Sequence, residues 1–431
     1  MGGVCLNAGC IPSKALLHAT HQIPAARESA RRGISFGPPQ IDMPALQAWK
    51  DGVLNKLANG IGMLAKKRGV TTITGQASFT ASNRIAVTTA EGEKIVEAEH
   101  VVLATGTEPA MPAAFDIGSR HVMTSTDALC LETVPGSILI VGGGYIGMEL
   151  GTVYASLGTE ITVVEALDGI LAGADPDLSR PVFLYAKRNF KQLLLGSTVR
   201  SLKECADGVE VEILSAGKVI SQRFDKVLIS VGRRPCTAGM GLEHTGCQLD
   251  ERGFVITTDH CRTDDPQIHA IGDINGGVLL AHKAARDARD AIADITKMES
   301  PAPALHIPAV VFTDPEIAWV GVTETEAKKK DLPHVVTKFS WGACGRSLTQ
   351  DRIDGATKLI IDPETEKLLG VGMVGPGAGE LIAEAALALK MGATVRDLAD
   401  TVHPHPTLSE TLMEAAEMFY GHAVHALPRK S

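Results

Sequence analysis

The sequence predicts an α/β protein, in which two related nucleotide-binding domains are followed by a separate α+β domain. Three observations support this prediction. Apolar runs that end in glycine or an acidic residue alternate with helix-like segments, which is typical of parallel sheets. A glycine fingerprint follows one of these runs directly. The chain has 431 residues, more than the roughly 250–300 residues of a single core, so several domains are expected.

Four apolar runs are predicted as strands, and two of them belong to matching segments. Residues 102–109 (VLATGTEP) and 228–235 (LISVGRRP) share a strand, a glycine and a proline three positions later. We interpret this match as two related α/β domains. The predicted strands are residues 100–106, 137–144, 161–165 and 226–232.

The first of these domains lacks a feature that the second one has. In the second, the glycine fingerprint at Gly142 precedes the closing strand, whereas no such fingerprint precedes Gly106. The opening strand, glycine turn and helix of the first domain are therefore expected to lie before Met1.

The C-terminal part of the chain predicts a different architecture. A helix of small residues is expected near 280–297, and the segment SPAPALHIP at 300–308 is typical of a linker. Period-2 and helical patterns then predict an α+β domain. Its strands are expected at 308–313, 335–340, 356–361 and 368–374, and its helices at 378–391 and 407–420.

Composition excludes several classes of function. The net charge of −9 and the aromatic content of 4% disfavour a nucleic-acid-binding surface, which needs basic and usually aromatic side chains. No apolar run approaches the ~20 residues of a membrane span. The eight cysteines are scattered along the chain, as in proteins of a reducing cytoplasm, so a cytoplasmic location without membrane attachment is expected.

One pair of cysteines stands out from this scatter. Cys5 and Cys10 lie just before a predicted helix that has Pro12 in its first turn. Residues five apart in a regular helix are ~7.5 Å apart along its axis, too far for a disulfide, so the segment must be distorted, and Gly9 allows this. A helix N-terminus favours thiolate. The spacing leaves open a redox pair or two ordinary buried cysteines, and disfavours a metal site because no second cysteine or histidine pair is nearby.

A dinucleotide-binding motif follows the strand at 137–144. The six residues 142–147 fit G-x-G-x-x-G between that strand and a helix, the arrangement of a Rossmann-like domain. Glu165 ends the next strand, where a carboxylate accepts hydrogen bonds from ribose hydroxyls and repels a 2′-phosphate, so NAD is favoured over NADP. The residues of the motif are Gly142, Gly143, Gly144, Tyr145, Ile146 and Gly147.

The string GGVCLNAGCIPSK resembles the redox motif of the class I pyridine-nucleotide disulfide oxidoreductases, and among them the dihydrolipoamide-oxidising flavoenzymes. The resemblance implies that Cys5 is the outer thiol, which exchanges with substrate, and that Cys10 faces the flavin. It places Lys14 near the reactive nitrogen of the flavin and pairs Lys14 with Glu149.

The same resemblance assigns further residues to the two cofactors, FAD and NAD. The segment TDDPQIHAIGD is similar to the second flavin motif of the family, in which Asp273 accepts a hydrogen bond from the ribityl chain. The other residues assigned to the flavin site are Ala77, Thr105, Gly106 and Ala281, and those assigned to the nicotinamide dinucleotide site are Val199 and Gly232.

A third motif, HPHPTLSE at 403–410, resembles the acid-base signature of the family. The resemblance implies that His405 is the base, that Glu410 orients it, and that His405 serves the cysteines of the other subunit in a homodimer. The residues alone leave two alternatives open. His403 and His405 could bind metal, and Thr407 with Glu410 could form a capping box for the following helix.

The complete prediction is an FAD- and NAD-dependent oxidation of protein-bound dihydrolipoamide through a Cys5–Cys10 disulfide, with the lipoyl-bearing proteins of 2-oxoacid dehydrogenase or glycine-cleavage complexes as partners and no metal. Its alternatives are a truncated, flavin-free and non-catalytic chain, and a different flavoprotein disulfide reductase. The predicted domains are an incomplete FAD-binding domain at 1–118, an NAD-binding domain at 119–238, a return to the central domain at 239–303 and a dimerisation domain at 304–431.

Overall fold

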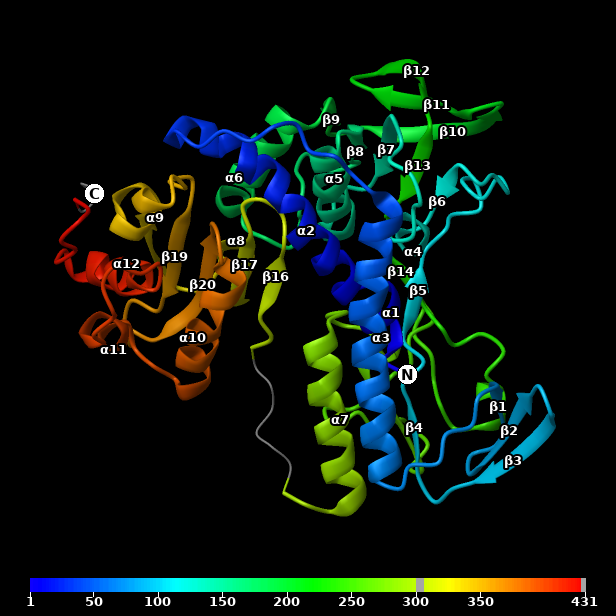
Figure 1. Cartoon of the computed structure of the whole chain (residues 1–431). Helices are drawn as coiled ribbons and strands as arrows, with labels where there is room; N and C mark the ends of the chain where they lie inside the picture. Colours follow the sequence, from blue (N-terminus) through cyan, green and yellow to red (C-terminus); the bar gives the residue numbers. More distant parts are fainter. Residues whose placement is uncertain (300–305, 428–431) are drawn as a thin grey trace. The chain divides into compact units, whose positions relative to one another are not determined.

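The computed structural model describes residues 1–299 and 306–427, which form two compact units (Figure 1). Among the described residues, the first unit holds 1–15, 42–111 and 231–299, and the second holds 16–41, 112–230 and 306–427. The proposed linker at 300–308 lies mostly outside the described residues. None of the described helices has both the length and the apolar character that a membrane crossing requires.

A five-stranded sheet in the order β6-β13-β7-β8-β9 forms the α/β part of the second unit, and each pair of neighbouring strands is parallel. The central strands β13, β7 and β8 are buried along most of their length, as expected for a parallel sheet covered on both faces. The predicted strands at 137–144, 161–165 and 226–232 are therefore confirmed. The elements are β6 (Val122–Met123), α4 (Ser125–Ala128), β7 (Ser137–Val141), α5 (Tyr145–Leu157), β8 (Glu160–Val164), α6 (Pro176–Asn189), β9 (Gln192–Leu194) and β13 (Lys226–Ile229).

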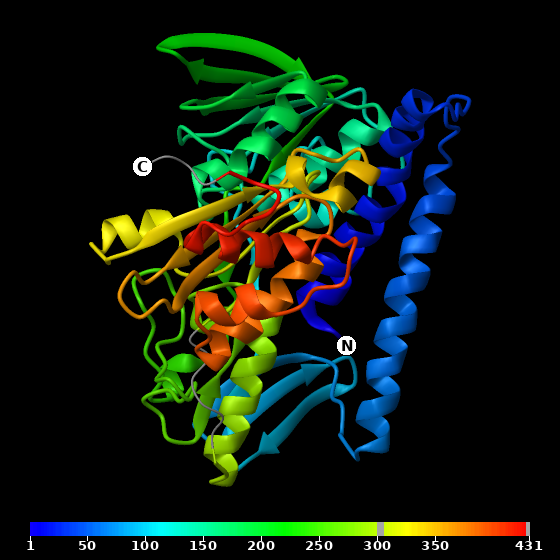
Figure 2. The same cartoon turned by 90° about the vertical axis from the view of Figure 1, so that its left-hand side faces the viewer.

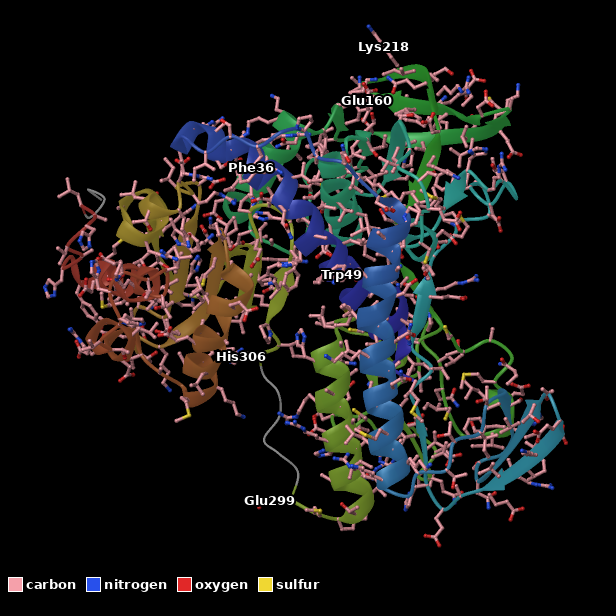
Figure 3. The ribbon with its side chains drawn as sticks, viewed as in Figure 1. Phe36, Trp49, Glu160, Lys218, Glu299 and His306 are labelled. Atoms are coloured by element: carbon pink, nitrogen blue, oxygen red, sulfur yellow. The ribbon has the colours of Figure 1, made fainter. Side chains whose placement is uncertain are left out.

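A three-stranded antiparallel sheet, which the sequence analysis did not predict, lies between β9 and β13 in the chain. It consists of β10 (Thr198–Cys205), β11 (Gly208–Ser215) and β12 (Lys218–Phe224), and Lys218 at the start of β12 is labelled in Figure 3. Apolar and polar residues alternate along β11, so that Val209, Val211 and Ile213 are buried.

The C-terminal part of the second unit is an α+β domain, as predicted. Its five strands are antiparallel in the order β16-β17-β20-β19-β18, and α10 and α12 pack against them. All four predicted strands are present, and β17 was missed. The elements are β16 (Ala309–Val311), β17 (Ile317–Gly321), α8 (Glu324–Lys329), β18 (Val335–Ser340), α9 (Gly345–Thr349), β19 (Ala356–Ile361), β20 (Leu368–Val374), α10 (Ala378–Met391), α11 (Val395–Asp400) and α12 (Glu410–Tyr420).

The first unit contains the shorter parallel pair β4 and β15 and a separate antiparallel sheet, β1-β2-β3. The long helix α3 runs unbroken (Figure 2) and leaves Trp49 46% exposed (Figure 3). The matching segments found in the sequence meet here, because β5 pairs with β14. The elements are α1 (Gly3–Ala8), α3 (Met43–Lys67), β1 (Gln76–Ala81), β2 (Arg84–Thr89), β3 (Gly92–Glu97), β4 (Val101–Leu103), β5 (Thr107–Pro109), β14 (Arg233–Pro235), β15 (Ile268–Ala270) and α7 (Ala281–Thr296), and α2 (Cys10–Ser29) begins in this unit.

The last helix starts later than expected. It was predicted at 407–420, but α12 begins at Glu410. Glu410 accepts a hydrogen bond from the Thr407 N–H (2.7 Å), which is one half of a capping box. The Thr407 hydroxyl donates to the carbonyl of Pro404 (2.7 Å) and lies 2.8 Å from the Ser409 hydroxyl, so it is bonded within the loop before α12.

Candidate functional site

The two cysteines lie on either side of a break between two helices. The helix α1 contains Cys5 and ends at Ala8. The next residue, Gly9, has a backbone conformation that is not helical (φ −147°, ψ −112°), and α2 begins at Cys10. The predicted distortion at Gly9 is thus confirmed, and it brings the two thiols into contact. A hydrogen bond with Cys10 and burial both raise the pKa of the Cys5 thiol, while the positive charge of Lys14 acts in the opposite direction.

Asp273 is presented by a tight turn at residues 272–275, which α7 holds in place. Gly272 begins the turn with φ +75°, and its N–H donates to Asp287 of α7 (2.9 Å). Lys283, one turn before Asp287, forms an ion pair with it (2.8 Å) and donates to the Gly272 carbonyl (3.0 Å). The motif therefore folds around a buried charge pair, and the Asp273 side chain stays 20% exposed beside it.

The carboxylate of Asp273 is oriented by Thr107, which the sequence analysis did not select. The buried Thr107 hydroxyl donates to Asp273 Oδ2 (2.7 Å) and accepts from Arg233 Nε (2.7 Å). A Cβ at the neighbouring Gly106 would meet no atom within 4 Å, so the backbone is open there. An oriented, partly exposed carboxylate next to open backbone fits the hydroxylated chain of a flavin. Thr105 directly precedes Gly106, and its hydroxyl donates to the carbonyl oxygen of Cys236 (3.0 Å).

The glycine fingerprint forms the predicted turn between β7 and α5. A Cβ at Gly147 would lie 2.3 Å from the Gly142 carbonyl oxygen, and Gly142 itself has φ +108°, so both positions need glycine. At Gly144, where α5 starts, an added Cβ would meet nothing within 4 Å. This open backbone at a helix N-terminus fits a pyrophosphate.

Glu165 lies against this turn. Its Oε2 accepts the Gly143 N–H (2.6 Å) and its Oε1 accepts the Leu167 N–H (2.8 Å), so two backbone donors fix the carboxylate at the end of β8. A carboxylate held in this way next to the fingerprint fits the ribose of NAD, as predicted.

Glu149 is buried on α5, with 3% of its surface exposed. Its Oε1 accepts the backbone N–H of Phe312 (3.0 Å). This bond accounts for one oxygen of a buried carboxylate, and the pairing of Glu149 with Lys14 stays a prediction.

His405 and Glu410 form the pair that the C-terminal motif predicts. His405 Nδ1 lies 2.9 Å from Glu410 Oε1, and the imidazole is 71% exposed while Glu410 is 17% exposed. Burial would raise the pKa of Glu410, but the Thr407 N–H and His405 outweigh it and lower that pKa. The ionised carboxylate fixes the ring through Nδ1 and leaves Nε2 for proton transfer, which suits a general base.

His403, the other histidine of the motif, is paired with a different carboxylate from His405. His403 Nε2 lies 2.8 Å from Glu384 Oε1 on α10, and His405 has its own carboxylate, Glu410. The metal-binding alternative for the two histidines is therefore not supported by their arrangement.

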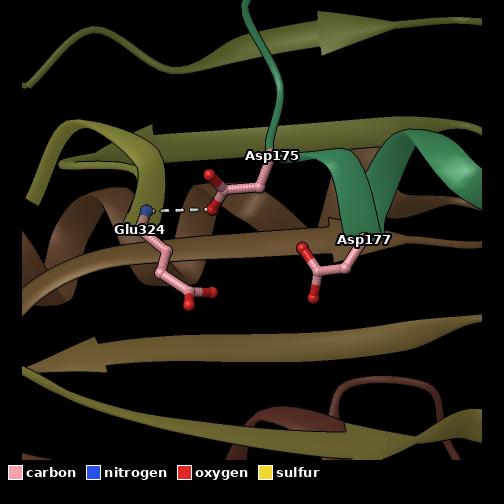
Figure 4. Close-up of side chains that lie close together, drawn as sticks. All are labelled: Asp175, Asp177 and Glu324. Carbon is pink, nitrogen blue, oxygen red and sulfur yellow. Dashed lines mark hydrogen bonds between the residues drawn. The ribbon is translucent and has the colours of Figure 1, made fainter. Parts of the chain in front are cut away.

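Three carboxylates of the second unit lie close enough together to hold a metal ion: Asp175, Asp177 and Glu324 (Figure 4). Lys358 on β19 occupies their centre. Its Nζ lies 3.0 Å from Asp175 and 2.9 Å from Asp177, it also contacts Glu324, and the side chain is only 1% exposed. The cluster is thus a buried ion-pair network between α6 and the C-terminal sheet.

We expect Lys358→Met to lower the free energy of unfolding of this unit by about 3–5 kcal/mol, because it removes the cation that pairs with the buried carboxylate of Asp175. Urea denaturation measures this change. Lys338→Met is the matched control, since Lys338 pairs with Asp177 (2.8 Å) near the surface and is 30% exposed. Equal effects of the two substitutions would contradict the buried network.

The network also predicts a pH dependence. Burial would raise the pKa values of Asp175, Asp177 and Glu324, but hydrogen bonds, including those from Lys358, outweigh it and lower all three. Carboxylates with lowered pKa values stabilise the fold above their ordinary range of about 4 and lose this contribution as the pH falls. The difference in stability between the wild type and Lys358→Met should therefore shrink in acid, and a difference that stays constant would exclude the network as its cause.

The predicted residues form four separate groups in the structure. The cysteine pair and the residues around Asp273 belong to the first unit, and the fingerprint with Glu165 and the pair His405–Glu410 belong to the second. The remaining predicted contacts are backbone positions: Ala77 on β1, Val199 on β10, Ala281 at the start of α7, and Gly232 with φ +136°. Thr107 and Arg233 were missed, although they hold equivalent positions after Gly106 and Gly232 in the matching segments.

Comparison with known proteins agrees with this arrangement. Residues 1–288 match the family described as pyridine nucleotide-disulphide oxidoreductase, and residues 307–416 match its dimerisation domain. A dihydrolipoyl dehydrogenase of Halobacterium salinarum is 41% identical over 99% of this chain and 91% of that protein. The corresponding figures for a dihydrolipoyl dehydrogenase of Bacillus subtilis are 40%, 99% and 90%.

Solved structures show the same fold. LpdA from Mycobacterium tuberculosis superposes with a TM-score of 0.90 at 26% identity, covering 97% of this chain and 92% of that one. The Cu(II) complex of the HOCl-induced flavoprotein disulfide reductase RclA from Escherichia coli gives a TM-score of 0.86 at 27% identity, covering 97% and 91%.

Proposed function

Since the chain belongs to the pyridine nucleotide-disulphide oxidoreductase family, we propose that it is a dihydrolipoyl dehydrogenase, which oxidises protein-bound dihydrolipoamide with FAD and NAD. The observation that carries the proposal is the contact between Cys5 and Cys10 at the N-terminus of α2. Two thiols held together at a helix N-terminus are suited to reversible disulfide formation.

In the oxidised enzyme, Cys5 and Cys10 form the disulfide that the substrate attacks. One substrate thiolate attacks the Cys5 sulfur and releases the Cys10 thiolate. The second substrate thiolate then attacks the substrate sulfur of the mixed disulfide and releases the Cys5 thiolate. The products are lipoamide and a reduced cysteine pair. His405 takes the proton of the substrate thiol at Nε2, while Glu410 holds the ring at Nδ1.

The chain's own residues also account for the cofactor sites. Asp273, oriented by Thr107, would hold the ribityl chain of FAD, and Gly142–Gly147 with Glu165 would hold NAD. FAD bound at the first site would supply the two-electron oxidation of the reduced cysteine pair, and NAD bound at the second would supply the final acceptor for a hydride. Lys14 would contribute a positive charge near Cys5.

The test is the activity of the purified chain. A visible flavin spectrum and NADH formation from dihydrolipoamide are expected together. A colourless preparation, or a flavin-containing one without NADH formation, would sink the proposal.

Glu165→Ala should raise the KM for NAD about tenfold, because the loss of a charged hydrogen-bond acceptor is worth about 1.5–3 kcal/mol. The preference for NAD over NADP should become smaller at the same time, since no carboxylate then repels the 2′-phosphate of NADP. Steady-state kinetics with both nucleotides measure this. Glu160→Ala, at the exposed start of β8 (Figure 3), is the control and should leave both KM values unchanged.

The partners follow from the same proposal. The match to a dimerisation domain supports a homodimer built by the C-terminal domain, with lipoyl-bearing proteins of 2-oxoacid dehydrogenase or glycine-cleavage complexes as substrates. A cytoplasmic location, expected from the scattered cysteines of the sequence, is part of the proposal. The domain boundaries at 118, 238 and 303 remain part of the proposal.

A further inference from the structure

A second histidine–carboxylate pair lies two residues before the proposed base. His403 Nε2 lies 2.8 Å from Glu384 Oε1, and His403 Nδ1 lies 2.9 Å from the carbonyl oxygen of Thr401. The imidazole of His403 is only 4% exposed, whereas that of His405 is 71% exposed. The two neighbouring histidines therefore lie in different environments and are suited to different roles.

Both partners of His403 are hydrogen-bond acceptors when Glu384 is ionised. A neutral imidazole has one N–H and can satisfy only one of them. Both bonds can form only when His403 and Glu384 together carry one proton more than a neutral imidazole and an ionised carboxylate. The ring is thus held from two sides, by Glu384 of α10 at Nε2 and by its own loop at Nδ1.

This pair fixes one end of the loop between α11 and α12, which carries His405. On the other side, the Thr407 hydroxyl donates to Pro404 (2.7 Å) and the Thr407 N–H donates to Glu410 (2.7 Å). The loop is thus attached to α10 through His403 and to α12 through Thr407, with His405 between the two attachments.

We propose that His403 is a positioning residue for His405: its buried ring, bonded to Glu384 on α10, anchors the loop that carries the base. The inference rests on the proposed role of His405. The charged groups that face the two rings are Glu384 for His403, and Glu410 for His405, with His425 acting on Glu410 in turn.

The anchor can be tested without catalysis. In the holoenzyme labelled with ¹⁵N-histidine, Glu384→Gln should move the ring signal that His403→Asn removes, because Nε2 then loses its ionised partner. A His403 ring signal that is the same in the wild type and in Glu384→Gln would overturn the proposal.

The kinetic test uses His403→Ala, which removes the bond to Glu384. We expect kcat/KM for dihydrolipoamide to fall about tenfold, because a loop that is no longer attached to α10 positions His405 less precisely. The double variant His403→Ala/Glu384→Gln should lose no more activity than His403→Ala alone, since the two side chains act through one bond.

The controls separate this inference from the proposed function. His334→Ala removes a ring whose Nδ1 also bonds a carbonyl two residues earlier (2.7 Å), but in an exposed place, and it should behave as the wild type. NADH oxidation by an artificial acceptor should be unchanged in every variant. A wild type that is inactive with dihydrolipoamide contradicts the proposed function, whereas an active wild type with an equally active His403→Ala variant contradicts only the role of His403.

Discussion

Cys5→Ser should lower the rate of NADH formation from dihydrolipoamide by roughly 10³-fold or more, because a hydroxyl cannot replace the thiol in disulfide exchange. Serine differs from cysteine by one atom, so α1 and the break at Gly9 should persist. The measurement is the absorbance of NADH under saturating dihydrolipoamide and NAD. The remaining Cys10 has no partner with which to form the disulfide that the substrate attacks.

Two comparisons make this result specific. Cys130→Ser changes an exposed cysteine far from the redox motif in the sequence and should keep full activity. NADH oxidation by an artificial acceptor should survive in Cys5→Ser, because it requires the nucleotide and flavin sites but no thiol exchange. Turnover of dihydrolipoamide that persists in Cys5→Ser would contradict the exchange role of this residue.

The fold could be predicted where a single strand carries its own signal. The strands β7, β8 and β13 are buried on both faces, so each is a continuous apolar run that ends in a glycine or an acid. The strand β17 was missed because Ile317–Gly321 is short and begins two residues after Pro315. The sheet β10–β12 was missed because polar residues alternate with apolar ones along its strands, and this pattern is weaker in a single sequence.

The site could be predicted where its residues lie in one motif, and not where partners are distant in the chain. Gly142–Gly147 and the Cys5–Cys10 string are local, so the first could be recognised from its spacing and context and the second from its resemblance to the redox motif of the family. Thr107 meets Asp273 across 166 positions, and Lys358 meets Asp175 across 183. No periodicity relates such residues, because a fold and not a spacing brings them together.

His405→Gln is the second substitution with a large expected effect. It should lower kcat/KM for dihydrolipoamide by about 10²–10⁴-fold, the usual contribution of a positioned general base. Glutamine cannot take a proton, although its amide can still reach Glu410. The activity should be measured across the pH range, and the loss should be smallest at high pH, where the substrate thiol ionises without help.

Glu410→Gln provides the comparison that assigns the roles within the pair. The Glu410 carboxylate, whose pKa is lowered by the Thr407 N–H and His405 despite its burial, stabilises the protonated ring and fixes it at Nδ1. Its neutral amide should keep the position of the ring but weaken its basicity, so the loss should be smaller than in His405→Gln and should move the acidic limb of the pH profile downward. Equal losses in the two variants at every pH would mean that the carboxylate, and not the imidazole, handles the proton.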